Sequence, residues 1–283
     1  VLLVLSPVLF RRWLGKIGTA VAATLLLLSP SISYYSRYVR HDAFNMLTAV
    51  LLIWAIFYYL QEGKARWLYI LAASFALLYT TKETSYIYTA IFGLLLCAPF
   101  AWRILVGAWE RPELYGFFLL ALALLIVAAA IFGYAFVGAE YQETALDEQG
   151  TNVAHVVLPL WGRIAALAML LTLLALGGLV FFGVGEQLLR QWRSFDLLMV
   201  LGTLTLPLSA ALFARLAGVD MLALYDALMG GDFSALLAAD LVITLVVVLV
   251  LLLASIFLGL WWDMRRWPVV AIVHYAIFTV FYT

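Results

Sequence analysis

Charged residues are scarce in this chain, since Asp, Glu, Lys and Arg make up only 11% of its 283 residues while hydrophobic residues make up 67%. Soluble domains carry about 25% charged and about 45–50% apolar residues, so a water-soluble globular domain is excluded. The 16 basic and 16 acidic residues cancel, and no basic excess indicates nucleic acid as a partner. The single cysteine, Cys97, excludes an intramolecular disulfide and a metal site built from thiolates.

The apolar residues fall into runs of the length that crosses a membrane as a helix, for which about 20 residues are needed. Ten runs can be counted, the outermost two incomplete: residues 1–10, 17–30, 43–61, 67–80, 87–101, 115–138, 159–184, 195–213, 237–260 and 268–283. The sequence therefore predicts an all-α fold, a polytopic transmembrane helical bundle of about ten spans. We expect a single transmembrane domain over residues 1–283, truncated at both ends because the chain starts at Val1 and its last apolar run stops at Thr283.

Two connections differ from the short loops elsewhere. Residues 138–158 form a polar segment with the turn formers Gly150, Thr151 and Asn152, which predicts an outer loop that leaves the membrane. Residues 214–236 are apolar but interrupted by three aspartates and a Gly-Gly pair. This pattern predicts an outer interfacial segment, a short helix at the membrane surface followed by a turn.

The distribution of Lys and Arg predicts the orientation, because cytoplasmic loops retain these residues. One set of alternate connections holds eleven of them and the other holds five, which are Arg37, Arg40, Lys82, Arg163 and Arg215. The first set is therefore placed in the cytoplasm, and ten of the sixteen acids fall in the connections of the other set. We expect a multi-pass protein of the cell (inner) membrane whose chemistry lies on the extracytoplasmic face.

The densest polar segment, Ser-Tyr-Tyr-Ser-Arg-Tyr-Val-Arg-His-Asp over residues 33–42, lies between two predicted spans on the outer side. In a helix Arg37, Arg40 and His41 would share one face, and arginine binds phosphate through paired charge-assisted hydrogen bonds. Asp42 has the chemistry to bind a divalent metal or to accept a proton from an attacking hydroxyl. The alternative is that the arginines reach to lipid headgroups and Asp42 only caps the following helix.

A second polar segment, residues 80–86, contains Lys82 and Glu83 between two apolar runs. Ionisable residues at this depth are costly and usually face a cavity, a partner or a substrate. The alternative is that Lys82 and Glu83 neutralise each other, although adjacent residues of a helix do not face one another. His274 lies inside the last apolar run, where we expect a hydrogen bond to a neighbouring helix.

Four stretches of the chain carry a family resemblance. They are Leu-Ser-Pro-Ser-Ile-Ser-Tyr-Tyr-Ser-Arg-Tyr-Val-Arg-His-Asp, Tyr-Leu-Gln-Glu-Gly-Lys-Ala-Arg-Trp-Leu-Tyr, Thr-Thr-Lys-Glu-Thr, and Gly-Leu-Trp-Trp-Asp-Met-Arg-Arg-Trp at residues 259–267. The chain resembles the multi-spanning GT-C glycosyltransferases related to protein O-mannosyltransferases, above all the bacterial and archaeal flippase activity-associated membrane proteins. The resemblance covers about residues 25–90 and 255–283, and the middle of the chain matches only in hydropathy.

The resemblance implies an enzyme that moves a sugar from a polyprenyl-phosphate donor to an acceptor on the outer face of the cell membrane. It implies that the lipid phosphate is bound by basic residues: Arg37, Arg40, His41 and Lys82. The catalytic carboxylates would be Asp42 and Glu83, and the expected cofactor is a divalent ion, Mg²⁺ or Mn²⁺, with Asp42 as a ligand. The expected partners are the donor, membrane lipid and further membrane proteins.

The family's principal acidic residue belongs to an outer loop N-terminal to everything in this chain. The main catalytic base is therefore not assigned, and we expect this chain alone to be inactive. Two other functions remain open: a non-catalytic scaffold or accessory subunit of a larger membrane complex, and a lipid-linked sugar flippase. The flippase is disfavoured because transporters commonly break helices at mid-membrane, whereas the charges here lie only at the ends of predicted spans.

Overall fold

The computed structural model describes residues 2–30, 42–81, 85–107, 109–137, 140–144, 153–157, 159–216, 219 and 239–282. The side chains of both strands and of Asp42 lie outside this description. The chain divides into two compact units. Unit 1 holds residues 1–101, 192–211 and 244–283, unit 2 holds the remainder, and each is described by itself.

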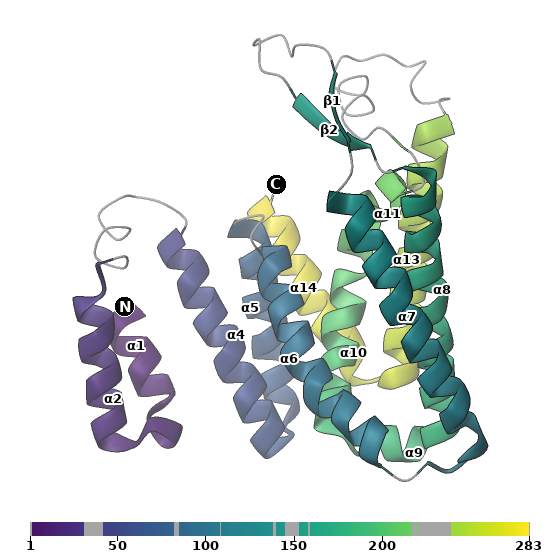
Figure 1. Ribbon diagram of the computed structural model, residues 1–283. Helices are drawn as coiled ribbons and strands as arrows, with labels where there is room; N and C mark the ends of the chain where they lie inside the picture. The colour runs from purple at the N-terminus through teal and green to yellow at the C-terminus, as the bar shows by residue number, and fades with distance from the viewer. Residues whose placement is uncertain are drawn as a thin grey trace. The chain divides into compact units, whose positions relative to one another are not determined.

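The described part of unit 1 is built from helices (Figure 1). They are α1 (Leu2–Leu9), α2 (Arg11–Leu28), α4 (Asp42–Glu62), α5 (Ala65–Thr81), most of α6 (Ser85–Val106), α10 (Arg193–Thr205), the 3₁₀ turn η1 (Pro207–Ser209), most of α13 (Ala239–Trp262) and α14 (Arg266–Tyr282). Unit 2 contains α7 (Glu113–Val137), β1 (Glu140–Thr144), β2 (Val153–Val157), α8 (Leu160–Val184), α9 (Glu186–Leu189) and most of α11 (Ala210–Leu216).

The all-α prediction is confirmed, since the described part of each of the ten predicted apolar runs is largely helical. Within the described residues, five helices are long and apolar enough to cross a membrane, and a sixth span results if α10 and the bent helix after it are counted together. The other runs are interrupted or short. Gly15, with φ of 68°, breaks α2, Pro207 follows α10 at a 44° bend, and α5 has only 17 residues.

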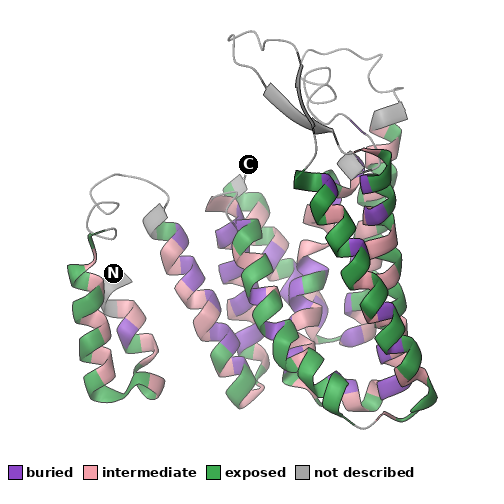
Figure 2. Ribbon diagram, viewed as in Figure 1, coloured by how far each residue is buried: buried purple, intermediate pink, exposed green. Residues whose placement is uncertain are grey.

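Helix α5 is the centre of unit 1, packed against α4 and α14. Leu68, Leu71, Phe75 and Leu78 are fully buried, and Figure 2 shows the buried positions gathered on α4 and α5. His274 of α14 is also fully buried, and its Nδ1 lies 3.2 Å from the carbonyl oxygen of Ala72 on α5. The predicted hydrogen bond between His274 and a neighbouring helix is confirmed.

The turn between α13 and α14 is built by the 259–267 motif. The Asp263 carboxylate accepts hydrogen bonds from the backbone N–H groups of Arg265 and Arg266, both at 2.9 Å, which satisfies free donors at the start of α14. The Trp262 indole donates to Asp196 of α10 at 2.7 Å. The motif therefore has a structural role, because it closes one turn and joins it to a third helix.

Asp196 connects three helices of unit 1, and its removal should destabilise the protein. Besides Trp262, its carboxylate accepts a hydrogen bond of 2.6 Å from the Tyr59 hydroxyl on α4, and both donor side chains are buried. Each buried donor left without an acceptor costs about 1–3 kcal/mol. We expect Asp196→Ala to lower the apparent melting temperature in detergent by about 5–10 °C. Glu113→Ala, which removes an exposed carboxylate, is the control, and equal melting temperatures would contradict the assignment.

In unit 2, α7 and α8 pack along each other through small residues. Ala121, Ala128 and Ala135 recur every seven residues and are all buried, as is usual where membrane helices approach closely. Residues 138–158 between these helices were predicted to be a polar loop. The structure instead has two strands there, β1 and β2, which pair antiparallel with Glu140 opposite Val157. The predicted interfacial segment 214–236 lies outside the described residues except for 214–216 and 219.

Candidate functional site

The backbone of unit 1 brings the helix ends that border both predicted clusters to one end of the unit. Helices α4 and α5 are joined by a short turn and pack together, so they run antiparallel. The start of α4 at Asp42 and the end of α5 at Thr81 therefore lie at the same end, and α6 begins close by at Ser85 (Figure 1). We call this the Asp42 end of unit 1, and the end with the α4–α5 turn the Glu62 end.

The predicted site residues are placed only in part. Asp42 is the first residue of α4, and its side chain is outside the described part of the chain. The other predicted site residues lie outside the described residues altogether: Arg37, Arg40, His41, Lys82 and Glu83. That these side chains converge on one cavity stays a prediction.

Polar side chains hold α5 and α6 together at the Asp42 end. The Ser85 hydroxyl donates to the carbonyl oxygen of Leu78 at 2.5 Å and is fully buried. Tyr79 and Thr89 form a hydroxyl pair at 3.0 Å. The ring of Tyr86, which is more than half exposed, stands perpendicular to the Tyr79 ring at 5.1 Å. The two helix ends on either side of residues 82–84 are therefore held in a defined arrangement.

Helix α4 contributes two buried polar side chains near the same end. Asn45 is 5% exposed and Thr48 is 1% exposed, and the Thr48 hydroxyl donates to the carbonyl oxygen of Asn45 at 2.9 Å. Residues three apart share a helix face, so Asn45 lies on the Asp42 side of α4. Asn45 was not among the residues predicted from the sequence, although its position three residues after Asp42 on a helix would have indicated it.

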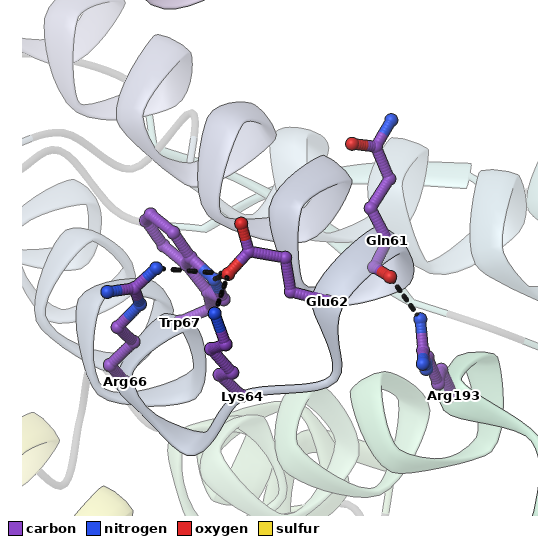
Figure 3. Close-up of polar contacts among 6 residues, drawn as sticks. All are labelled: Gln61, Glu62, Lys64, Arg66, Trp67 and Arg193. Atoms are coloured by element: carbon purple, nitrogen blue, oxygen red, sulfur yellow. Dashed lines mark hydrogen bonds and ion pairs between the residues drawn. The ribbon is translucent and has the colours of Figure 1, made fainter.

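The Glu62 end of unit 1 is a closed ionic cluster (Figure 3). The Glu62 carboxylate lies 3.1 Å from the Lys64 ammonium and 3.0 Å from the Arg66 guanidinium. It also accepts a 3.1 Å hydrogen bond from the indole of Trp67. Four residues of the Tyr-Leu-Gln-Glu-Gly-Lys-Ala-Arg-Trp motif thus satisfy one another.

A cation from α10 completes this turn. The Arg193 guanidinium donates to the carbonyl oxygens of Leu60 at 2.8 Å and Gln61 at 2.5 Å, which lack partners within α4 because the helix ends there. Gly63 has φ of 69°, and a Cβ at this position would lie 3.0 Å from Arg193 Nε. The conformation and the close approach both favour glycine.

These contacts show that two of the four stretches that carried the resemblance have a structural role. Residues 59–69 and 259–267 build turns in which charged and indole groups have partners within the protein. The carboxylates of Glu62 and Asp263 and the indoles of Trp67 and Trp262 are therefore engaged in holding these turns. The two clusters that border the Asp42 end remain the predicted site.

The first half of the chain, which contains both clusters, also matches a known family. Residues 3–137 fit the sequence model of the family described as Dolichyl-phosphate-mannose-protein mannosyltransferase. The match supports a GT-C-type, mannosyltransferase-like membrane protein. No curated protein and no solved structure gives a match to the chain.

The description of this family names dolichyl phosphate mannose, a lipid-linked sugar. The match ends with α7, so it includes the Asp42 end of unit 1 together with α1, α2 and the whole of α6. The match does not extend to α8–α14.

The expected divalent metal has no assembled ligand set among the residues that the structure describes, where no three His, Cys, Asp or Glu side chains are grouped for it. The side chain of Asp42 is not among these described residues. Mg²⁺ and Mn²⁺ prefer oxygen ligands, and Asp42 stays the predicted one.

Proposed function

We propose that the protein transfers a sugar from a polyprenyl-phosphate donor to an acceptor at the Asp42 end of unit 1. The observation that supports the proposal is that the helix ends bordering both polar clusters lie together, within the segment that matches the mannosyltransferase family. A transfer of this kind needs a cationic site for the phosphate and an acidic group for the incoming hydroxyl. The two clusters contain both kinds of residue.

In this proposal the lipid phosphate is bound by the basic residues Arg37, Arg40, His41 and Lys82. Guanidinium groups replace the hydration that a phosphate loses at a membrane surface, and they stabilise the charge that develops on the leaving phosphate. Asp42 and Glu83 are the carboxylates beside the acceptor hydroxyl, where they assist its deprotonation, and the main catalytic base stays unassigned. A divalent cation held by Asp42 would add positive charge near the leaving group.

We assign the reaction to the extracytoplasmic face. The Glu62 end carries Lys64, Arg66 and Arg193, and cytoplasmic ends of spans are rich in such residues. The Asp42 end lies at the opposite end of α4 and would face the outside. Membrane enzymes that use polyprenyl-linked donors can meet their acceptors there without a soluble sugar nucleotide.

The buried polar residues near Asp42 support a positioning role for α4. Asn45 and Thr48 are buried in an otherwise apolar helix, where a polar side chain is retained at a cost. Asn45 lies on the Asp42 side of α4, which suits a residue that fixes the start of the helix beneath the reacting groups.

The function is tested by reconstituting the full-length protein in liposomes with polyprenyl-phosphate sugars and following release of the polyprenyl phosphate. Mannose is the first sugar to try because of the family match. Formation of glycosylated product on the outer face is the expected result. Binding of the donor without any transfer would favour the non-catalytic scaffold or accessory subunit, and movement of intact donor across the bilayer would favour a flippase.

A further inference from the structure

The start of α2, where the chain turns after α1, carries three exposed cations, Arg11, Arg12 and Lys16. We call these three residues the basic turn. Among the described residues no carboxylate lies within ion-pair distance of any of them. Gly15, with φ of 68°, interrupts the helix between Arg12 and Lys16. Positive charge is therefore concentrated at one place without neutralisation by the described part of the chain.

Aromatic contacts fix the basic turn against α4. The Trp13 ring lies 5.6 Å from the Phe57 ring and 5.0 Å from the Tyr58 ring, both nearly edge-on. The guanidinium carbon of Arg12 lies 5.9 Å from the centre of the Tyr58 ring, within the range of a cation–π contact. The turn is thus attached to the Glu62 end of unit 1 and has a defined position there.

The adjoining α4–α5 turn does not supply the missing negative charge. The Tyr58 ring lies tilted by 35° to the Trp67 ring with the centres 4.6 Å apart, and the guanidinium carbon of Arg66 lies 4.6 Å from the Trp67 ring centre. Arg12 and Arg66 therefore border the same aromatic pair. Glu62, the acid of this turn, is already bound to Arg66 and Lys64, so within the described residues the charge of the basic turn is left available to an external anion.

An apolar strip on α2 continues directly from the basic turn. Ile17, Val21, Leu25 and Leu28 recur at intervals of three and four residues, which places them on one face of the helix. Each is more than half exposed, and no residue of α2 is buried. A basic end followed by about three turns of exposed apolar surface matches a ligand with an anionic head and a hydrocarbon chain.

We propose that the basic turn and this strip of α2 bind one anionic diacyl phospholipid. The lipid phosphate contacts Arg11, Arg12 and Lys16, and an acyl chain lies along the strip from Ile17 to Leu28. Clusters of Lys and Arg beside a membrane helix bind anionic lipids, and Trp and Tyr rings prefer the headgroup level at which the phosphate sits.

This site is separate from the proposed donor site. Tyr58 and Asp42 are sixteen residues apart on one helix, a separation of about 24 Å along the axis. The two sites would therefore take different lipids, and one can fail a test while the other stands.

Binding of fluorescent phosphatidylglycerol to the purified protein in detergent, measured by anisotropy, tests the proposal. We expect the wild type to prefer phosphatidylglycerol over phosphatidylcholine. The variant Arg11→Gln/Arg12→Gln should bind it about 10–30-fold more weakly. Added salt should weaken wild-type binding and change that of the variant much less.

The matched control is Arg111→Gln/Arg265→Gln, which also removes two exposed arginines but at other turns. It should bind as the wild type does, and Arg11→Lys/Arg12→Lys should restore most of the affinity because the charge is kept. Equal weakening by the control variant, or equal affinity for phosphatidylcholine, would overturn the proposal. So would displacement of phosphatidylglycerol by polyprenyl phosphate at equal concentration, since the site would then belong to the donor.

Discussion

Asp42→Asn should lower the rate of sugar transfer by about 10²–10⁴-fold, the usual contribution of a positioned acid or base. Asparagine keeps the size and polarity of aspartate but neither accepts a proton nor attracts a cation. Asp42 is the first residue of α4, where loss of a negative charge costs a helix only about 0.3–1 kcal/mol, so the helix itself should persist. A loss of activity with unchanged melting temperature would therefore report chemistry and not folding.

In the same assay, Arg40→Ala should weaken the contact of the protein with the lipid phosphate. We expect kcat/KM to fall by about 10²-fold or more, since the lost guanidinium stabilises both the bound donor and the leaving phosphate. Arg163→Ala is the matched control because Arg163 is an exposed arginine in the predicted outer set. Glu143→Gln is the control for Asp42→Asn. Unchanged turnover in both Asp42→Asn and Arg40→Ala would remove the site assignment.

Gly259→Ala should be the most damaging small substitution in unit 1. A Cβ at position 259 of α13 would overlap the indole of Trp267 on α14. Trp267 is buried, and its indole donates to the Thr203 hydroxyl at 3.1 Å. Displacing the ring breaks this hydrogen bond and overpacks the α13–α14 contact, at a cost of about 2–4 kcal/mol. The apparent melting temperature should fall accordingly.

Gly178→Ala is the control for this prediction, since a Cβ there meets no atom within 4 Å. Alanine in a helix is favoured over glycine by about 1 kcal/mol, so the control should be neutral or more stable. The double variant Gly259→Ala/Trp267→Leu tests the mechanism, because the added methyl group should cost little once the indole is gone. Equal melting temperatures for Gly259→Ala and Gly178→Ala would contradict the close packing.

Hydropathy predicted where the helices lie, because each apolar run must satisfy its backbone internally in lipid. It did not predict which runs form full spans, since the break at Gly15 depends on a positive φ and the bend after α10 on Pro207. The strand pair β1–β2 was missed because the polar composition of residues 138–158 favours a loop.

The sequence alone distinguished the candidate site residues from the structural residues only in part. Glu62 and Asp263 belong to stretches that resemble the family, yet their partners make them turn builders. The contact of Asp196 with Tyr59 joins residues 137 apart, a separation that no local pattern reveals. Asn45 could have been found from its spacing to Asp42, whereas the Tyr79–Thr89 pair depends on how α5 and α6 meet.

The central claim, that a polyprenyl phosphate binds at the Asp42 end, is tested most directly by photo-crosslinking. The full-length protein in liposomes would be irradiated with a polyprenyl-phosphate sugar that carries a photoreactive group beside the phosphate, and the labelled peptides identified by mass spectrometry. The account predicts labelling within residues 33–49 and 78–89 that unlabelled donor suppresses and Arg40→Ala reduces. Labelling spread over exposed α7 and α8, unaffected by either treatment, would contradict it.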